Sequence, residues 1–323
     1  MTSSSQPVVS VLVTCFNHER YVEQALDSLA AQTYGALQLA IVDDCSTDGS
    51  VARIEAWLER SDVDAQLVVN PRNLGVCATR NVGLGRLRGE FVASLSADDW
   101  YEPDKIERQV ELFATLDDDV SSVYGNMRLV DEYGHDAGLF YPDVFPDEMR
   151  AEGRIFDHLI RKNFIPAPTV MTRRAAYDEV GGYDESLTYD DEDMWLRLSR
   201  RFRFAYLPAV VVNWRVLESS LSRDPARRVE QRESGARLLA KWFGITAELD
   251  EVIADRIWTR GVQVYLADAR RGRAILCDPR LVRERRLRRW FVRASGVPGA
   301  RHVARMLVWM QTTARSLVTT WRS

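Results

Sequence analysis

Apolar and polar positions alternate along the first 120 residues in two interleaved patterns. Short apolar runs, each long enough for one buried strand, are separated by stretches whose apolar residues recur every three or four positions, as on one face of a helix. Strands that alternate regularly with helices predict an α/β fold with a mainly parallel sheet and flanking helices. The predicted strands are 8–14, 37–43, 65–69 and 90–96, and the predicted helices are 19–31, 48–60, 75–88 and 103–116.

The pattern becomes less regular after residue 116. Another strand is predicted over 120–126, followed by a loop-rich stretch to about 165, and loops of this length are often functional. We then expect an apolar segment, a helix and a last strand, at 168–172, 190–202 and 204–212. Helical, Arg-rich sequence follows, so the predicted domains are an α/β domain over 1–222 and a C-terminal helical extension over 223–323.

Charge differs sharply between these two parts of the chain. Residues 269–323 hold fourteen Arg, no Lys and two acidic residues, a net charge of +12, whereas residues 1–268 carry −16. We expect the acidic and basic parts to meet different partners. The N-terminus shows no signal peptide pattern, and the four Cys lack the spacing of a zinc site or a disulfide framework. These features predict a cytoplasmic protein with reduced thiols.

Polar residues gather where the predicted strands end. In open parallel sheets ligands bind beyond the carboxyl ends of the strands, so these residues are candidates for a binding site. Two strand ends carry neighbouring carboxylates, Asp43-Asp44 and Asp98-Asp99, and four carboxylates at one crevice would repel one another without a cation. This predicts Mg²⁺ or Mn²⁺ held by oxygen ligands. The alternative is that each Asp caps the next helix, which is our preferred interpretation of Asp48.

Four segments between residues 8 and 222 carry motifs. The chain opens with VSVLVTCFNHERYVEQALDSLAAQTY and continues with IVDDCSTDGS. Later come NLGVCATRNVGL at 73–84, SLSADDW at 94–100 and GGYDESLTYDDEDMWLRL at 181–198. In this order they resemble the start, the N-x-G-x-x-x-A-R-N-x-G element, the metal-binding region and the catalytic-base region of inverting, GT-A-fold family 2 glycosyltransferases, with Thr79 in place of the usual Ala.

The resemblance implies a GT-A, Rossmann-like fold and transfer of a sugar from a nucleotide-diphosphate sugar. Asp44 would accept a hydrogen bond from the N–H of the nucleotide base, Asp98 and Asp99 would face the ribose and the metal, and Arg80 would lie near the diphosphate. The implied nucleotide-binding residues are Thr14, Phe16, Asn17, Asp44, Arg80 and Asp98, and the implied metal ligands are Asp99 and Asp98.

Two positions depart from the family pattern. The fuller D-x-D-D form would have an acid where Ser96 stands, which bears on metal affinity and on the division of roles between Asp98 and Asp99. Many members also carry an Arg-x-His pair after the last strand, whereas Leu217 stands two residues after Arg215 here. We therefore expect no histidine contact to the metal at that point.

The reaction also requires a base, because an acceptor hydroxyl is a poor nucleophile until its proton is removed. The candidate acids are Asp190-Asp191-Glu192-Asp193, at the start of the predicted helix 190–202. Asp191 continues the apolar stripe of Trp195, Leu198 and Phe202, so we expect Asp191 to face inward as the general base. The other three acids are interpreted as complementing the positive helix N-terminus.

These observations predict a metal-dependent transferase that favours UDP or dTDP sugars. The resemblance implies inversion at the anomeric carbon and a role in surface polysaccharide or glycolipid assembly, on a glycan or lipid-linked acceptor. Asn17 to Arg20 offer no Gly-rich phosphate loop, which argues against a sugar-nucleotide pyrophosphorylase. A catalytically silent sugar-nucleotide-binding or scaffold protein, recruited by its basic tail, remains the alternative. Nucleic-acid binding is not favoured, because no recognised nucleic-acid module surrounds the arginines.

The basic tail has its own predicted partner. Residues 303–321 place apolar side chains on one helical face with arginines off it, and Leu287, Trp290, Phe291 and Ala294 repeat the arrangement. Basic amphipathic helices with Trp bind in the plane of anionic membranes, so we expect residues 280–322 to place the protein on the inner face of the cell membrane. The alternative is that the same stripes pack against the catalytic domain or form a dimer interface.

Overall fold

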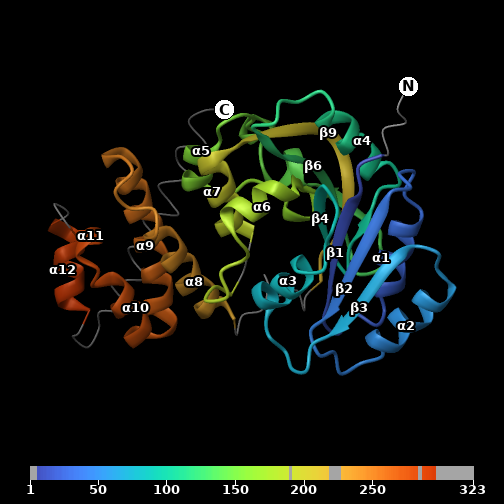
Figure 1. Cartoon of the computed structure of the whole chain (residues 1–323). Helices are drawn as coiled ribbons and strands as arrows, with labels where there is room; N and C mark the ends of the chain where they lie inside the picture. Colours follow the sequence, from blue (N-terminus) through green and yellow to red (C-terminus); the bar gives the residue numbers. More distant parts are fainter. Residues whose placement is uncertain (1–5, 189–190, 218–226, 283–285, 296–323) are drawn as a thin grey trace. The chain divides into compact units, whose positions relative to one another are not determined.

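The computed structural model describes residues 6–188, 191–217, 227–282 and 286–295. Contacts along the chain divide it into two units, Met1–Glu218 and Ser219–Ser323 (Figure 1). The predicted domain boundary at 222/223 falls within 218–226, outside the described residues.

Parallel strands form one half of a nine-stranded sheet in the first unit. They lie in the order β3-β2-β1-β4, so that β2 and β4 flank β1 on either side. All four therefore end at the same edge of the sheet, which confirms the predicted parallel α/β core. Their bounds are β1 Val9–Cys15, β2 Leu37–Asp43, β3 Asp64–Val69 and β4 Phe91–Ser96.

The other half of the sheet is mixed. β8 is antiparallel to both β4 and β6, β6 runs parallel to β9, and β5 is antiparallel to β9. β7 pairs with β6 off this path. The bounds are β5 Trp100–Tyr101, β6 Val120–Val130, β7 Asp136–Leu139, β8 Met171–Arg173 and β9 Arg203–Arg215. The predicted strands at 120–126 and 204–212 thus exist but are longer than expected.

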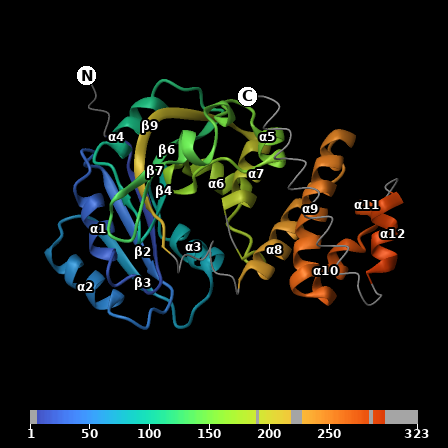
Figure 2. The same ribbon diagram turned by 180° about the vertical axis from the view of Figure 1, so that it is seen from behind.

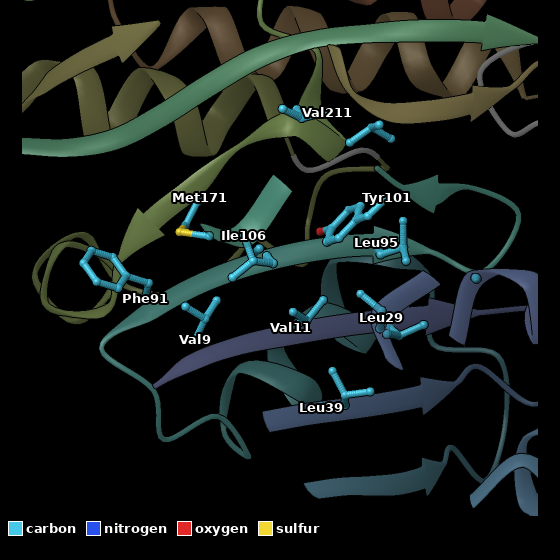
Figure 3. Packing of buried hydrophobic residues seen from close by; sticks show 14 of the residues in the cluster. Val9, Val11, Leu29, Leu39, Phe91, Leu95, Tyr101, Ile106, Met171 and Val211 are labelled. Carbon is cyan, nitrogen blue, oxygen red and sulfur yellow. The ribbon is translucent and has the colours of Figure 1, made fainter. Parts of the chain in front are cut away.

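Amphipathic helices cover both faces of the parallel half. Helices α1 Val22–Ala30, α2 Ser50–Arg60 and α4 Lys105–Phe113 pack on the face that carries Val11, with Leu29 and Ile106 in that core (Figure 3). Helix α3, Val76–Leu84, lies on the opposite face, where a Cβ added at Gly83 would stand 2.0 Å from Leu12 Cδ1. The missing side chain of Gly83 therefore lets α3 approach the sheet closely.

The stretch from 131 to 202 contains more regular structure than the sequence predicted. Besides β7 and β8 it holds three α-helices, of which the sequence predicted only the last. Their bounds are α5 Phe156–Arg161, α6 Arg174–Val180 and α7 Asp191–Arg201, and shorter helical turns are η1 Phe140–Val144, η2 Asp147–Met149 and η3 Ala167–Thr169.

The second unit is helical, as predicted (Figure 2). Its described helices are α8 Arg228–Ala240, α9 Ala247–Ala267, α10 Ala269–Leu276, α11 Pro279–Val282 and α12 Arg286–Ala294. Phe291 of α12 is 1% exposed and packs edge-on against Trp258 and Tyr265 of α9, with ring centroids 5.7 Å apart in both pairs. The prediction that Phe291 faces a membrane is therefore wrong, because its ring belongs to the core of this unit.

The remaining parts of the proposed membrane surface are not described by the structure. Residues 296–323, which include the predicted stripe at 303–321, and the side chains of Leu287, Trp290 and Ala294 lie outside the described residues. Within the described part of the chain, no helix is both long enough and apolar enough to span a bilayer.

Candidate active site

The loops after β1 and β2 are joined to each other by hydrogen bonds. The N–H of Asn17 donates to Ser46 Oγ, and the carboxamide Oδ1 of Asn17 accepts from the N–H of Thr47, each at 2.8 Å. Asn17 and Cys45 have positive φ angles of 58° and 65°, a conformation that costs a non-Gly residue about 1–2 kcal/mol. Such strained residues cluster at binding sites, where the surrounding structure holds them in place. The side-chain oxygen of Asn17 therefore holds the loop after β2 in place at the predicted pocket.

Three N–H groups donate hydrogen bonds to the Asp44 carboxylate at the end of β2. Its carboxylate, which is 5% exposed, accepts hydrogen bonds from Asn70 Nδ2 and the N–H of Leu74 on Oδ1, and from the N–H of Gly75 on Oδ2. Gly75 has a φ of 85°, which favours glycine, and this turn directs its N–H toward Asp44. An ionised carboxylate has about four acceptor positions, so Oδ2 retains capacity for one more donor.

Thr14 lies near the end of β1, the strand next to β2, and Phe16 directly follows β1. Phe16 is 36% exposed, which is high for a large apolar side chain, and Thr14 is half-buried. The backbone joins the strand ends directly, because the N–H of Asp44 donates to Cys15 O and the N–H of Ala97 donates to Thr14 O. The predicted residues after β1, β2 and β4 therefore meet at one edge of the sheet.

Asp98 and Asp99 follow β4 at this edge. The Asp98 side chain is 12% exposed and its Oδ1 lies 3.9 Å from Nε2 of His18. Asp99 is 3% exposed, and its Oδ1 accepts the N–H of Arg215 at 2.8 Å. Burial, and then the negative charge of Asp98, raise the pKa of Asp99 well above its usual value, although the N–H and the charge of Arg215 oppose this.

Oxygen ligands and uncompensated negative charge suit a hard divalent cation. Oδ2 of Asp99 accepts no hydrogen bond from any described residue, and Asp98 is open to solvent on one side. The two residues therefore fit as ligands of Mg²⁺ or Mn²⁺, which prefer carboxylate oxygens and usually keep further positions for phosphate or water.

The predicted cluster of four carboxylates does not form. Asp43 is fully buried, and its carboxylate accepts hydrogen bonds from the N–H and the hydroxyl of Ser46. The Asp44 carboxylate accepts the three hydrogen bonds described above. Accordingly, no group of three or more His, Cys, Asp or Glu side chains in the described chain is arranged to hold a metal. Asp48 lies one residue before Gly49, the N-cap residue of α2, and its Oδ1 accepts the N–H of Ser50, the first residue of that helix.

Arg80 projects from α3 toward β4. Its Nη1 donates to Ser94 Oγ at 3.2 Å, and its guanidinium carbon lies 5.5 Å from the centroid of the Tyr183 ring. Thr79, the departure from the family motif, is buried, and its Oγ1 accepts a hydrogen bond from Asn70, the residue that also holds Asp44. Thr79 therefore adds a hydrogen bond to Asn70 that an alanine at this position would lack.

Asn81, the last polar residue of the same motif, is a site residue that the sequence did not reveal. Its Nδ2 donates to Tyr183 O and its Oδ1 accepts the N–H of Tyr183, at 2.9 and 2.7 Å. A Cβ at Gly182 would stand 2.6 Å from Oδ1 of Asn81, so glycine permits this approach. Helix α3 thereby holds the loop that leads to α7.

The acidic residues at the start of helix α7 make different contacts. Asp193 is 1% exposed and pairs with Arg197 at 2.8 Å, and Arg197 also donates to carbonyls in the turn after α6. Glu192 is likewise buried. These two acids do not merely complement the helix N-terminus, and Asp191 is not the most inward of the four. The prediction of the helix face was wrong because α7 is buried on several sides, from Met194 through Leu196.

Asp191 is half-buried at the first position of α7. The N–H of Glu192 donates to its Oδ1 at 2.8 Å, and Asn163 Nδ2 donates to its Oδ2 at 3.3 Å. Its carboxylate is thus oriented and still reachable from solvent, whereas that of Asp193 is committed to Arg197. Asn163, from the loop after α5, was not anticipated from the sequence.

An α/β sheet with carboxylates at its strand ends is the arrangement expected for a nucleotide-sugar-dependent transferase, and comparison with known proteins identifies the family. The sequence pattern of glycosyl transferase family 2 matches residues 10–180, more than half of the chain, and the protein belongs to this family. It is 27% identical over 244 residues to an uncharacterized glycosyltransferase of Rickettsia typhi, covering 75% of this chain and 73% of the relative. It is also 27% identical over 220 residues to TuaG of Bacillus subtilis, a glycosyltransferase provisionally assigned to teichuronic acid biosynthesis, covering 68% and 83%.

Solved structures share the fold at lower sequence identity. S. aureus TarS 1-349 in complex with UDP-GlcNAc has a TM-score of 0.68 and 19% identity, covering 94% of this chain and 92% of that one. The mannosyltransferase PcManGT from Pyrobaculum calidifontis, in complex with GDP-Man and Mn²⁺, has a TM-score of 0.61 and 20% identity, covering 93% and 87%. The GT-A-like fold with C-terminal helices is therefore confirmed.

Proposed function

We propose that the protein transfers a sugar from a nucleoside-diphosphate donor to an acceptor hydroxyl, with inversion at the anomeric carbon and dependence on Mn²⁺ or Mg²⁺. The observation that carries the proposal is the placement of Asp44, with one acceptor position left, after β2 and of the Asp98-Asp99 pair after β4, on either side of β1 at the same edge of the sheet. The first suits a nucleotide base and the second suits a metal-bound diphosphate.

The nucleotide base is the part of the donor that Asp44 recognises. Oδ2 accepts one further N–H, which the imide of uracil or thymine supplies, and Phe16 offers an apolar surface beside it. Guanine also carries such a group, and the relatives bind both kinds of donor, since TarS binds UDP-GlcNAc and PcManGT binds GDP-Man. The single remaining position favours UDP or dTDP sugars.

Asp98 and Asp99 hold the metal, with Asp98 also facing the ribose. A divalent cation at this point neutralises charge on the diphosphate as the glycosidic bond breaks. Arg80, above Ser94 on β4, adds positive charge on the side of α3. Because Ser96 is not an acid, Asp98 and Asp99 would be the two carboxylates that hold the cation, which would neutralise charge on the diphosphate.

Asp191 accepts the proton of the acceptor hydroxyl. The N–H of Glu192 and the amide of Asn163 fix the two oxygens of its carboxylate, so that Asp191 is held in one orientation for an incoming hydroxyl. Attack from the face opposite the diphosphate then inverts the anomeric carbon. A positioned general base of this kind contributes about 10²–10⁴-fold to the rate.

We further propose a setting in surface polysaccharide or glycolipid assembly, at the inner face of the membrane. TuaG and TarS are relatives, and TuaG is linked by name to teichuronic acid, a polymer of this class. In the described part of the second unit, Arg270, Arg273, Arg289 and Arg293 are exposed, which suits an anionic lipid surface. The acceptor is a glycan or a lipid-linked sugar.

The test is nucleotide release from a panel of UDP, dTDP and GDP sugars, with and without Mn²⁺, using a glycolipid extract as acceptor. We expect release with UDP or dTDP sugars that Mn²⁺ stimulates, and loss of that stimulation in Asp99→Asn. Asp62→Asn, at an exposed acid away from the strand ends, is the matched control and should keep wild-type release. Tight UDP binding without release for any sugar and acceptor would favour the silent binding protein instead.

A further inference from the structure

Arg215 ends β9 as a buried arginine with an unusual number of partners. It is 2% exposed, and its guanidinium donates hydrogen bonds to three backbone carbonyls and one side chain. Nε donates to Asp98 O at 3.0 Å, Nη1 to Glu132 O at 2.8 Å and to Asp131 O at 3.3 Å, and Nη2 to Gln24 Oε1 at 2.7 Å. Four of its five N–H donors are therefore engaged.

Two aromatic rings flank the same guanidinium. Its central carbon lies 4.5 Å from the centroid of Tyr21 and 4.9 Å from that of Trp100, within the range of favourable cation–π contacts. A buried charge is costly unless it is paired and hydrogen-bonded. Here the rings and the carbonyls satisfy it without a carboxylate in direct contact, so the positive charge stays available to the nearby Asp98 and Asp99.

Arg215 contacts both carboxylate residues at the end of β4. Its side chain holds the backbone of Asp98, and its own N–H holds Oδ1 of Asp99. Because the guanidinium is anchored at the same time to α1 and to the turn between β6 and β7, the peptide that joins Asp98 to Asp99 is fixed against three other segments. A planar fork of fixed geometry can do this, whereas a lysine ammonium cannot reach the same set of carbonyls.

We propose that Arg215 is a positioning residue for the metal site: its guanidinium holds the peptide that joins Asp98 to Asp99 and thereby sets the affinity of the nucleotide complex for a divalent cation. This inference rests on the proposed role of Asp98 and Asp99 as metal ligands. Residues that orient metal ligands typically contribute 10- to 100-fold to metal affinity.

The experiment is calorimetric titration of Mn²⁺ into the full chain saturated with UDP, with bound Mn²⁺ followed in parallel by electron paramagnetic resonance. We expect Arg215→Lys and Arg215→Met to bind Mn²⁺ 10- to 100-fold more weakly than wild type, while UDP affinity without metal changes less than threefold. Lysine keeps the charge but not the fork, so wild-type affinity in Arg215→Lys overturns the proposal.

Arg173 provides the matched control. It also donates to a backbone carbonyl, that of Val120, and its guanidinium also lies near two rings, those of Phe91 and Phe113, at the opposite end of β4. Arg173→Lys removes one bond to a carbonyl and two ring contacts of the same kind, away from Asp98 and Asp99, and should leave Mn²⁺ affinity unchanged. An equal loss in Arg173→Lys would mean that any disturbance of the sheet weakens the metal site, and would overturn a specific role for Arg215.

Two further variants separate the remaining outcomes. Gln24→Ala, at an exposed residue, removes one hydrogen-bond partner of the Arg215 guanidinium and should weaken Mn²⁺ binding about threefold. If Arg215→Lys does not fold, Gln24→Ala serves as the test. Unchanged Mn²⁺ affinity in Gln24→Ala then overturns the proposal. Asp99→Asn tests the metal site itself. If Asp99→Asn keeps wild-type Mn²⁺ affinity, the proposed site is wrong and the inference falls with it; if only Asp99→Asn loses affinity, the site stands and Arg215 has no part in it.

Discussion

Lys105, the first residue of α4, is a fully buried lysine. Its Nζ donates to Gln109 Oε1 at 2.7 Å and lies 4.2 Å from the centroid of the Tyr101 ring. No carboxylate among its described contacts compensates the charge, and burial lowers the pKa of Lys105 from 10.5 to about 7. We predict that this residue makes the stability of the first unit depend on pH.

The sign follows from proton binding in the two states. Above pH 7 the folded protein loses the proton of Lys105, whereas the unfolded chain keeps it up to about pH 10.5. The unfolded state then binds more protons, so the free energy of unfolding rises with pH across this window and is flat below it. The limiting slope is about 1.4 kcal/mol per pH unit, and the expected gain from pH 7 to pH 9 is about 2 kcal/mol, since the folded group is half-protonated at pH 7.

The assay is urea unfolding of wild type and Lys105→Met between pH 6 and 9. The lost hydrogen bond to Gln109 changes the stability of the variant by a constant amount, so only the difference between the two proteins as a function of pH matters. That difference should shift by about 2 kcal/mol in favour of wild type between pH 7 and 9. Lys162→Met, at an exposed lysine, gives the background. A difference that stays constant with pH would refute the reasoning.

Three further predictions concern the base, its helix and the basic tail. Asp191→Asn should keep UDP binding and lower sugar transfer about 100-fold or more, which single-turnover kinetics would measure; near-normal transfer would exclude Asp191 as the base. Asp193→Ala should instead lower the free energy of unfolding by roughly 3 kcal/mol, because Arg197 loses its buried partner, and thermal melting would detect this. Full-length protein should float with anionic vesicles at low salt and much less with neutral vesicles or at high salt; no flotation at low salt would end the membrane proposal.

The parallel half of the sheet could be predicted because its strands alternate with helices in the sequence. β2 has the predicted bounds, and the buried positions of α1, Val22, Ala25, Leu26 and Leu29, recur with helical spacing. In the other half only β6 and β9 were predicted, since β5 and β8 have only two and three residues and pair with strands far along the chain. Such short strands leave no periodic signal.

The sequence predicted the location of a site residue only where that residue directly follows a predicted strand. The carboxylates after β2 and β4 lie at one edge of the sheet because parallel strands end there, although the four do not form the single cluster that was predicted. The face of α7 was not predictable from one apolar stripe, because Arg197 draws Asp193 into the interior. The sequence indicated nothing about Arg215 except that no histidine follows it. Its hydrogen-bond partners are mostly backbone carbonyls, and because every residue has one, the sequence carries no signal for them.

The contacts of Arg215 also bear on the order in which the protein matures during synthesis. Arg215 lies 116 residues after Asp99 and 191 residues after Gln24, so a nascent chain makes both sides of the pocket long before the residue that joins them. Contacts of such sequence separation form late, because closing a long loop costs conformational entropy. A chain that has left the ribosome only as far as β8 therefore has the strands that precede Asp44, Asp98 and Asp99 but not β9, so the hydrogen bonds from Arg215 to Asp98 and Asp99 form only when β9 joins the sheet.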